Sequence, residues 1–184
     1  GRKGLPAMLV LVLALVLPAL VAWNGCAPGM LLADMHTGTG EQRRELLADG
    51  TQLTLSSGTA LNQQLGLDLR RIELLRGAVL VDVAKDARRP FVVDTPHGRI
   101  QALGTRFIVR LENGATRLTM IESRTSVRAG EAGAATQTLE AGQQARLTPG
   151  GLEWLEPVSP GVVEDAFRLR RLVVRDMPMA EVLD

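Results

Sequence analysis

The sequence is poor in the residues that most metal, sugar and nucleic-acid sites require. Its 184 residues include one cysteine, two histidines and no tyrosine, and aromatic residues make up only 3%. A single cysteine excludes an internal disulfide, and two isolated histidines offer no metal-ligand spacing. So few aromatic side chains argue against a surface on which bases or sugars stack. With a net charge of +1, the chain also lacks the basic excess of nucleic-acid-binding proteins.

Signatures of the common enzyme classes are missing too. His36 and His97 stand alone in loop-like contexts, outside any recognisable catalytic motif, and the sequence has no phosphate-binding loop. Asp82, Asp94 and Glu122 are carboxylates that could pair in the fold, but strand acids more often face solvent or bond a neighbouring arginine. We predict a protein that is not a turnover enzyme and that uses no cofactor and no metal.

A long apolar run near the start is the first positive feature. "LPAMLVLVLALVLPALVAW", residues 5–23, has no charged side chain, and as a helix it would rise about 28 Å, close to the thickness of bilayer hydrocarbon. Arg2 and Lys3 precede it and Trp23 ends it. By the positive-inside rule this predicts a cytoplasmic stub at 1–4, a transmembrane helix at 5–23, and the remaining chain on the far side of the membrane.

Two other interpretations of the run stay open. A cleaved signal peptide would have a shorter apolar core and small residues at its cleavage site. A lipoprotein anchor at Cys26 would fit poorly with Trp23 and Asn24 just upstream. Residues 24–36 are rich in turn formers and weak in periodicity, which predicts a juxtamembrane connector.

Short alternating runs dominate residues 37–157 and predict an all-β domain, either an antiparallel two-sheet sandwich or an open barrel. Asp49-Gly50 and Asn113-Gly114 are hairpin signals because both residue types tolerate positive φ. In "LGLDLRRIELL" we expect Leu65, Leu67 and Leu69 to share one face. In "AVLVDVA", residues 78–84, we expect Val79, Val81 and Val83 to face away from Leu80 and Asp82. The charged cluster "KDARRP", residues 85–90, is expected to be a solvated hairpin connection, with a patch for an acidic partner as the alternative.

Residues 158–184 differ in character from the β region. Pro157, Pro160 and Gly161 predict a hinge, followed by a helical turn, a short strand at 172–174 and a new helix. We expect this to be the start of a small α/β domain that is cut off at Asp184. Since the first residue is Gly1 rather than Met, we also expect the sequence to be part of a longer chain.

"RIQALGTRFIVR", residues 99–110, alternates like a strand but changes phase at Gly104-Thr105. One interpretation is a β-bulge that lets Leu103 and Phe107 both enter the core. The other is chemical: a threonine hydroxyl can attack the preceding carbonyl through a five-membered ring, and glycine leaves that approach open. Gly104 and Thr105 are therefore a candidate self-cleavage junction, for which the sequence identifies no base.

Several stretches together resemble the FecR-like family of inner-membrane anti-sigma regulators of cell-surface signalling. They are "LADGTQLTL", "LLRGAVLVDVAKD", "PFVVDT" and "ALGTRF", in this order, with "LVVRDMPMAEVLD" near the end. The resemblance covers residues 37–184, nearly all of the part beyond the predicted span. Some members of this family are associated with self-cleavage at the Gly-Thr that corresponds to Gly104-Thr105.

The resemblance implies a protein of the bacterial inner membrane with one span, a cytoplasmic amino terminus and a periplasmic carboxy-terminal part. Its expected partners are an extracytoplasmic-function sigma factor, bound by a segment before Gly1, and the signalling domain of a TonB-dependent receptor for ferric complexes. Docking of that domain is expected past the β domain, with proteases relaying the signal. An alternative is a structural or carbohydrate-interacting β-sandwich of the cell envelope with no sigma factor.

Overall fold

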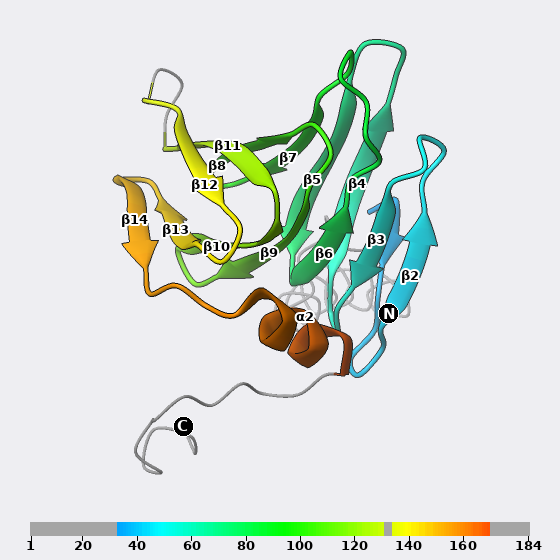
Figure 1. The fold of residues 1–184 in the computed structure, drawn as a ribbon. Helices are drawn as coiled ribbons and strands as arrows, with labels where there is room; N and C mark the ends of the chain where they lie inside the picture. The colour runs from blue at the N-terminus through cyan, green and yellow to red at the C-terminus, as the bar shows by residue number, and fades with distance from the viewer. Residues whose placement is uncertain (1–32, 131–133, 170–184) are drawn as a thin grey trace, which may run out of the picture.

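Residues 33–130 and 134–169, which the computed structural model describes, form two seven-stranded sheets (Figure 1). Sheet A has the order β1 (Met35–His36), β4 (Ala60–Leu65), β5 (Arg70–Arg76), β7 (Phe91–Thr95), β8 (Gly98–Ala102), β11 (Arg124–Ala129), β12 (Gln137–Glu140). Sheet B has the order β14 (Gly151–Leu155), β13 (Gln144–Thr148), β10 (Ala115–Glu122), β9 (Arg106–Glu112), β6 (Ala78–Asp82), β3 (Gln52–Leu55), β2 (Arg43–Leu46). The two-sheet sandwich prediction is confirmed.

The predicted membrane span, residues 5–23, lies outside the described residues, as do the strand and helix expected after residue 170. In the two described stretches, no helix is long and apolar enough to cross a bilayer.

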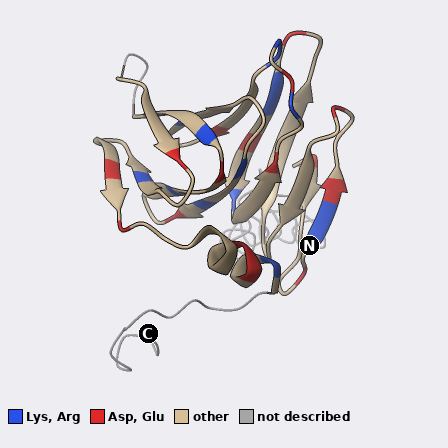
Figure 2. Ribbon diagram, viewed as in Figure 1, with Lys and Arg blue, Asp and Glu red and all other residues tan. Residues whose placement is uncertain are grey.

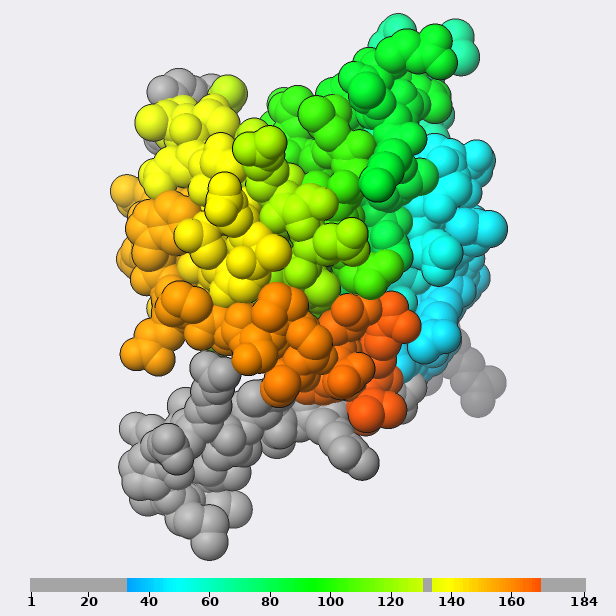
Figure 3. Space-filling model, viewed as in Figure 1, coloured from blue at the N-terminus to red at the C-terminus, as the bar shows by residue number. Residues whose placement is uncertain are grey.

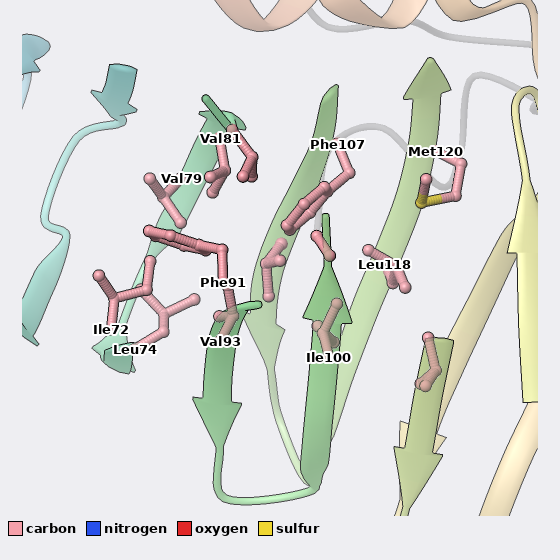
Figure 4. Packing of buried hydrophobic residues seen from close by; sticks show 14 of the residues in the cluster. Ile72, Leu74, Val79, Val81, Phe91, Val93, Ile100, Phe107, Leu118 and Met120 are labelled. Atoms are coloured by element: carbon pink, nitrogen blue, oxygen red, sulfur yellow. The ribbon is translucent and has the colours of Figure 1, made fainter. Parts of the chain in front are cut away.

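The core lies between the sheets, where alternate residues of facing strands meet. Figure 4 shows Val79 and Val81 of sheet B beside Phe91 of sheet A, with Phe107 from β9 packed into the same layer. All four side chains are fully buried. The predicted period-two pattern of β6 is thus confirmed, because its valines point inward while Leu80 faces the other side of sheet B.

One strand pair departs from the expected antiparallel arrangement. β5 and β7 run parallel, with Arg70 opposite Phe91 and Glu73 opposite Asp94. The intervening strand β6 belongs to sheet B, so the chain crosses to that sheet and returns in its original direction. The prediction that residues 85–90 form a hairpin connection is therefore wrong, because they join strands of different sheets.

The stretch from Leu65 to Leu69 also differs from its prediction. It is the tip of the β4–β5 hairpin, closed by a hydrogen bond from Gly66 N to Leu69 O of 2.8 Å. Leu67 is 89% exposed, so the three leucines do not share a buried face. The alternation of leucines here reflects the turn, in which successive residues no longer alternate between the faces of a sheet.

Helix α2 (Pro160–Leu169) covers part of the outer face of sheet B. Phe167, with Val163 beside it, packs on a second small apolar cluster made of Ala78, Leu80, Ile108 and Ile121. Gln42 Nε2 donates a 3.2 Å hydrogen bond to Phe167 O and ties the end of the helix to the chain before β2. Sheet B is consequently apolar on both faces over this region.

The strand pairings define two ends of the sandwich. Gln52 lies opposite Asp82 and Asp82 opposite Arg106, so the β2–β3 turn, the β6–β7 connection and the β8–β9 link meet at one end. The β4–β5 tip joins them, since Arg70 lies opposite Phe91. We call this the Leu67 end. The β5–β6, β7–β8 and β9–β10 turns lie at the other end, which we call the Asn113 end.

Candidate functional site

Gly104 and Thr105 link β8 of sheet A to β9 of sheet B at the Leu67 end. The interpretation of this pair as a bulge that buries both neighbours is wrong, because Leu103 is 53% exposed whereas Phe107 is fully buried. The phase change in the sequence marks the point at which the chain leaves one sheet for the other. The predicted junction is therefore an inter-sheet crossover.

Glycine is required at position 104 for two independent reasons. Its φ of +145° lies in a region of backbone conformation that residues other than glycine rarely adopt. A Cβ atom at this position would also lie 2.7 Å from Lys85 Cγ and 3.2 Å from Lys85 Cα. Lys85 therefore packs directly on the Gly104 backbone.

Two backbone hydrogen bonds hold the residues on either side of Gly104. Val83 N donates to Thr105 O at 3.0 Å, and Asp86 N donates to Leu103 O at 3.3 Å. Residues 83–86 of the β6–β7 connection thus clamp the junction from both sides. The position of the Gly104–Thr105 peptide depends on how firmly that connection is held.

The side chain of Arg70 holds the β6–β7 connection in place through several hydrogen bonds. It is 1% exposed; its Nη1 donates to Ala84 O at 2.9 Å, and its Nε and Nη2 donate to Arg89 O at 3.0 and 2.6 Å. Asp49 neutralises it at 3.1 Å, and the guanidinium lies 5.7 Å from the centre of the Phe91 ring. Burial of an arginine is tolerated only with such partners. The sequence pattern did not indicate a role for Arg70, because a charged residue in a strand gives no signal of burial.

The hydroxyl of Thr105 is enclosed. The residue is 7% exposed, and its Oγ1 lies 3.4 Å from Oγ1 of Thr125, its one hydrogen-bond partner among the described residues. His97 lies at the opposite end of β8, roughly 20 Å along the strand from Gly104. Its Nδ1 contacts Thr116 Oγ1 at 3.0 Å, so it belongs to another network.

A positive charge follows the junction directly. Arg106 forms an ion pair with Asp82 at 2.7 Å and approaches Glu164 of α2 at 3.6 Å. The hydrogen bond to Asp82, aided by the charges of Asp82, Glu164 and Glu122, raises the pKa of Arg106. Glu164 also pairs with Arg168 at 2.7 Å. Helix α2 is in this way linked by charge to the residue after Thr105.

The other candidate groups are not brought together. Asp82 bonds Arg106, and Asp94 bonds Arg99 and Arg71, which confirms the expectation that strand acids bond neighbouring arginines. Within residues 33–130 and 134–169, no three metal-ligating side chains cluster. Acidic and basic positions are interspersed over the sheets and loops (Figure 2).

Comparisons with solved structures support the fold, and a family model identifies the family. Two crystal structures of a "putative anti-sigma factor" from Parabacteroides distasonis ATCC 8503, at 1.65 and 2.50 Å resolution, each match with a TM-score of 0.66 and 22% identity. Each match covers 81% of this chain and 70% of the other. No curated protein sequence matches. Residues 33–132 match the family described as FecR protein, and the chain therefore belongs to the FecR family.

Proposed function

We propose that the chain is a membrane-anchored anti-sigma regulator that relays a periplasmic signal to an extracytoplasmic-function sigma factor. The observation that carries this proposal is the FecR domain at residues 33–132, placed directly after an apolar run long enough to span a bilayer. The proposed localisation is the bacterial inner membrane, with the β-sandwich in the periplasm. The proposed signal source is the signalling domain of a TonB-dependent outer-membrane receptor for ferric complexes.

The proposed receptor contact lies in the chain after helix α2. To test it, the receptor signalling domains encoded in the same genome are added to the complete chain in nanodiscs. The matched control is the chain ended after Leu169, which keeps every described element. We expect one domain to bind the complete chain and not the shortened chain. If none binds even when the chain carries its natural downstream sequence, the receptor proposal is wrong.

The proposed sigma-factor contact lies in a segment before Gly1, so its test uses the protein with its natural upstream sequence. Deleting the gene should change transcription from a promoter read by the sigma factor encoded beside it, and a plasmid copy should restore it. Unchanged transcription from every such promoter would contradict an anti-sigma role.

We also propose that the Gly104–Thr105 bond cleaves itself. Thr105 Oγ1 attacks the Gly104 carbonyl carbon, the hydroxyl proton passes to the Thr105 nitrogen, and the C–N bond breaks to leave an ester. Water then hydrolyses the ester, giving a Gly104 carboxylate and a free amino group on Thr105. The left-handed Gly104, the contact with Lys85 and the hydrogen bonds at Leu103 O and Thr105 O support this proposal, because they fix the peptide in an unusual conformation.

The topology supports a cut that does not dismantle the domain. Residues 33–104 contribute β2, β3 and β6 to sheet B, whereas β9, β10, β13 and β14 come from the chain after the junction. The two parts are joined by the β6–β9 pairing, with five residue pairs, and the β8–β11 pairing, with four. The fragments would remain one folded unit held by sheet hydrogen bonds and the shared core.

Mass spectrometry of the purified chain tests the cleavage. We expect two fragments, the second beginning at Thr105, in the wild type and in Thr105→Ser, and one intact chain in Thr105→Ala. Thr125→Val is the matched variant, because it removes the partner of the Thr105 hydroxyl and leaves the nucleophile in place; it should slow cleavage. An intact wild-type chain would show that Gly104 serves packing alone.

A carbohydrate-binding role is the second candidate, and one observation favours it: Trp154 on the edge strand β14 is 52% exposed. Phe91, Phe107 and Phe167 are buried, so Trp154 is the one exposed aromatic residue of the described chain. Binding to envelope glycans that is lost in Trp154→Ala would favour this candidate over the regulator.

A further inference from the structure

Exposed leucines gather at the Leu67 end of the sandwich. Leu46 is 70% exposed, Leu67 89% and Leu103 53%. Leu46 ends β2, Leu67 lies in the β4–β5 turn, and Leu103 directly follows β8. A single exposed leucine is ordinary, whereas several on adjoining turns mark a surface that contacts an apolar partner. In Figure 3 the β4–β5 tip and the neighbouring β6–β7 connection project from the body of the domain.

Two exposed cations at this end, Lys85 and Arg88, have no ion pair within the part of the chain that the structure describes. Asp49 pairs with Arg70 and Asp86 with Arg89, which leaves Asp68 as the exposed acidic residue of these loops. Arg88, Asp68 and Leu67 line the same shallow hollow. Projecting aliphatic tips with cations behind them suit the interface of an anionic bilayer, where the tips reach the acyl chains and the cations meet phosphate.

The direction in which the chain enters the domain at β1 also supports a membrane contact at the Leu67 end. β1 runs antiparallel to β4, with Met35 opposite Leu61, and Gln63 N donates to Asp34 Oδ2 at 2.9 Å. Followed backwards from Met35, the backbone therefore heads along β4 toward the Leu67 tip. Residues 24–32, between the predicted span and Ala33, can bridge about 30 Å at most. The anchor would thus hold the Leu67 end close to the bilayer.

We propose that the Leu67 end docks on the surface of the membrane in which the chain is anchored, with anionic phospholipid as its partner. Leu46, Leu67 and Leu103 enter the interfacial layer, and Lys85 and Arg88 contact lipid phosphates. This inference rests on the proposed membrane anchor and goes beyond it. It places the Gly104–Thr105 junction, next to Leu103, against the bilayer.

The test uses the complete chain in vesicles, with Cys26 replaced by serine and an environment-sensitive fluorophore attached at Leu67→Cys or Asn113→Cys. Asn113 is the matched control, because it is an exposed turn residue at the opposite end. Vesicles contain phosphatidylcholine alone or with phosphatidylglycerol, and a fraction carries doxyl-labelled lipid as a quencher. We expect quenching at position 67 to exceed that at position 113 about threefold in anionic vesicles, and to fall when Arg88→Glu is added.

Flotation of the vesicles separates this inference from the anchor on which it rests. A chain that floats with the vesicles but shows equal quenching at both positions overturns the docking and leaves the anchor standing. A chain that does not float overturns both. A blue shift at position 67 without lipid quenching would identify a second copy of the chain as the occupant, and would also overturn the membrane surface.

Discussion

The two ends of the sandwich are built on different principles. At the Asn113 end, turns are short and polar groups bond one another: Thr116 Oγ1 donates to Thr95 Oγ1 at 2.9 Å, beside the contact between Thr116 and His97. At the Leu67 end, a buried arginine holds a longer connection, and leucines face outward. The Leu67 end holds a candidate bond for cleavage and a candidate docking surface. The first requires an unusual backbone conformation at Gly104, and the second requires leucine side chains exposed to solvent.

Removing the counter-charge of Arg70 should destabilise the fold more than any other change considered at the Leu67 end. Asp49→Ala leaves a buried, uncompensated guanidinium and should lower the free energy of unfolding by about 3–5 kcal/mol. Asp94→Ala, which removes the partner of half-exposed arginines, is the control and should cost about 1 kcal/mol or less. Urea unfolding of both variants checks the difference; equal losses would show that Arg70 is not buried with Asp49.

Alanine substitutions at three glycines with positive φ compare the packing of the backbone at the two ends. A Cβ at Gly77 would lie 2.6 Å from Thr59 Cα, whereas at Gly104 its nearest atom is the flexible Lys85 Cγ. We expect Gly77→Ala to cost about 3 kcal/mol and Gly104→Ala about 2 kcal/mol. Gly114→Ala meets no atom within 4 Å and should cost only about 1 kcal/mol of backbone strain. Thermal unfolding gives the order, and a harmless Gly77→Ala would contradict the close packing of the Asn113 end.

Thr116→Val tests the polar network of the Asn113 end. Thr116 is fully buried, and losing its hydroxyl leaves His97 Nδ1 and Thr95 Oγ1 each without one partner. The expected loss is about 1–2 kcal/mol, measured by urea unfolding. Thr119→Val, which removes one bond from Gln144, is the neighbouring control and should cost less. No loss in Thr116→Val would mean that water replaces the hydroxyl.

Leu67→Ser should leave folding unchanged, within about 0.5 kcal/mol, because the side chain has almost nothing to pack against. Leu61→Ala in the same strand pair removes a fully buried side chain and should cost about 2–5 kcal/mol. A clear loss of stability in Leu67→Ser would show that this leucine serves the fold rather than a partner.

The smallest expected effect is an acid dependence at Asp86. The side chain of Arg89 and then the backbone N–H of Arg88 hold the pKa of this carboxyl below its usual value of 3.8. A lowered folded-state pKa adds stability above the unfolded value, and this stability disappears as the pH falls through the folded value. The melting temperatures of wild type and Asp86→Asn should therefore differ by a constant amount near neutral pH and converge below pH 3.8. A gap that persists there would contradict the ion pair.

The sequence predicted the sandwich well because its signals are local. Alternation in β6 identified the inward valines, and Asn113-Gly114 identified a hairpin. The same local rules failed where the chain changes sheet, because the parallel pairing of β5 with β7 depends on β6 lying in the other sheet. They also failed at Leu67, which is exposed because it lies in a turn rather than in the strand that the alternation predicted. At the junction, the pattern located Gly104 and Thr105 but neither Lys85 nor Arg70, since these contacts join segments far apart in the sequence.

The inter-sheet crossover also bears on the order of events when the chain folds. Gly104 acquires its conformation only when β6, β8 and β9 are in place, and β6 pairs with a strand more than twenty residues away. Sandwiches dominated by such distant pairings fold in milliseconds to seconds, slowly for their size. An acyl shift that depends on this geometry cannot begin in the nascent or unfolded chain. Cleavage would therefore begin only after the domain has folded, and misfolded molecules would stay uncut.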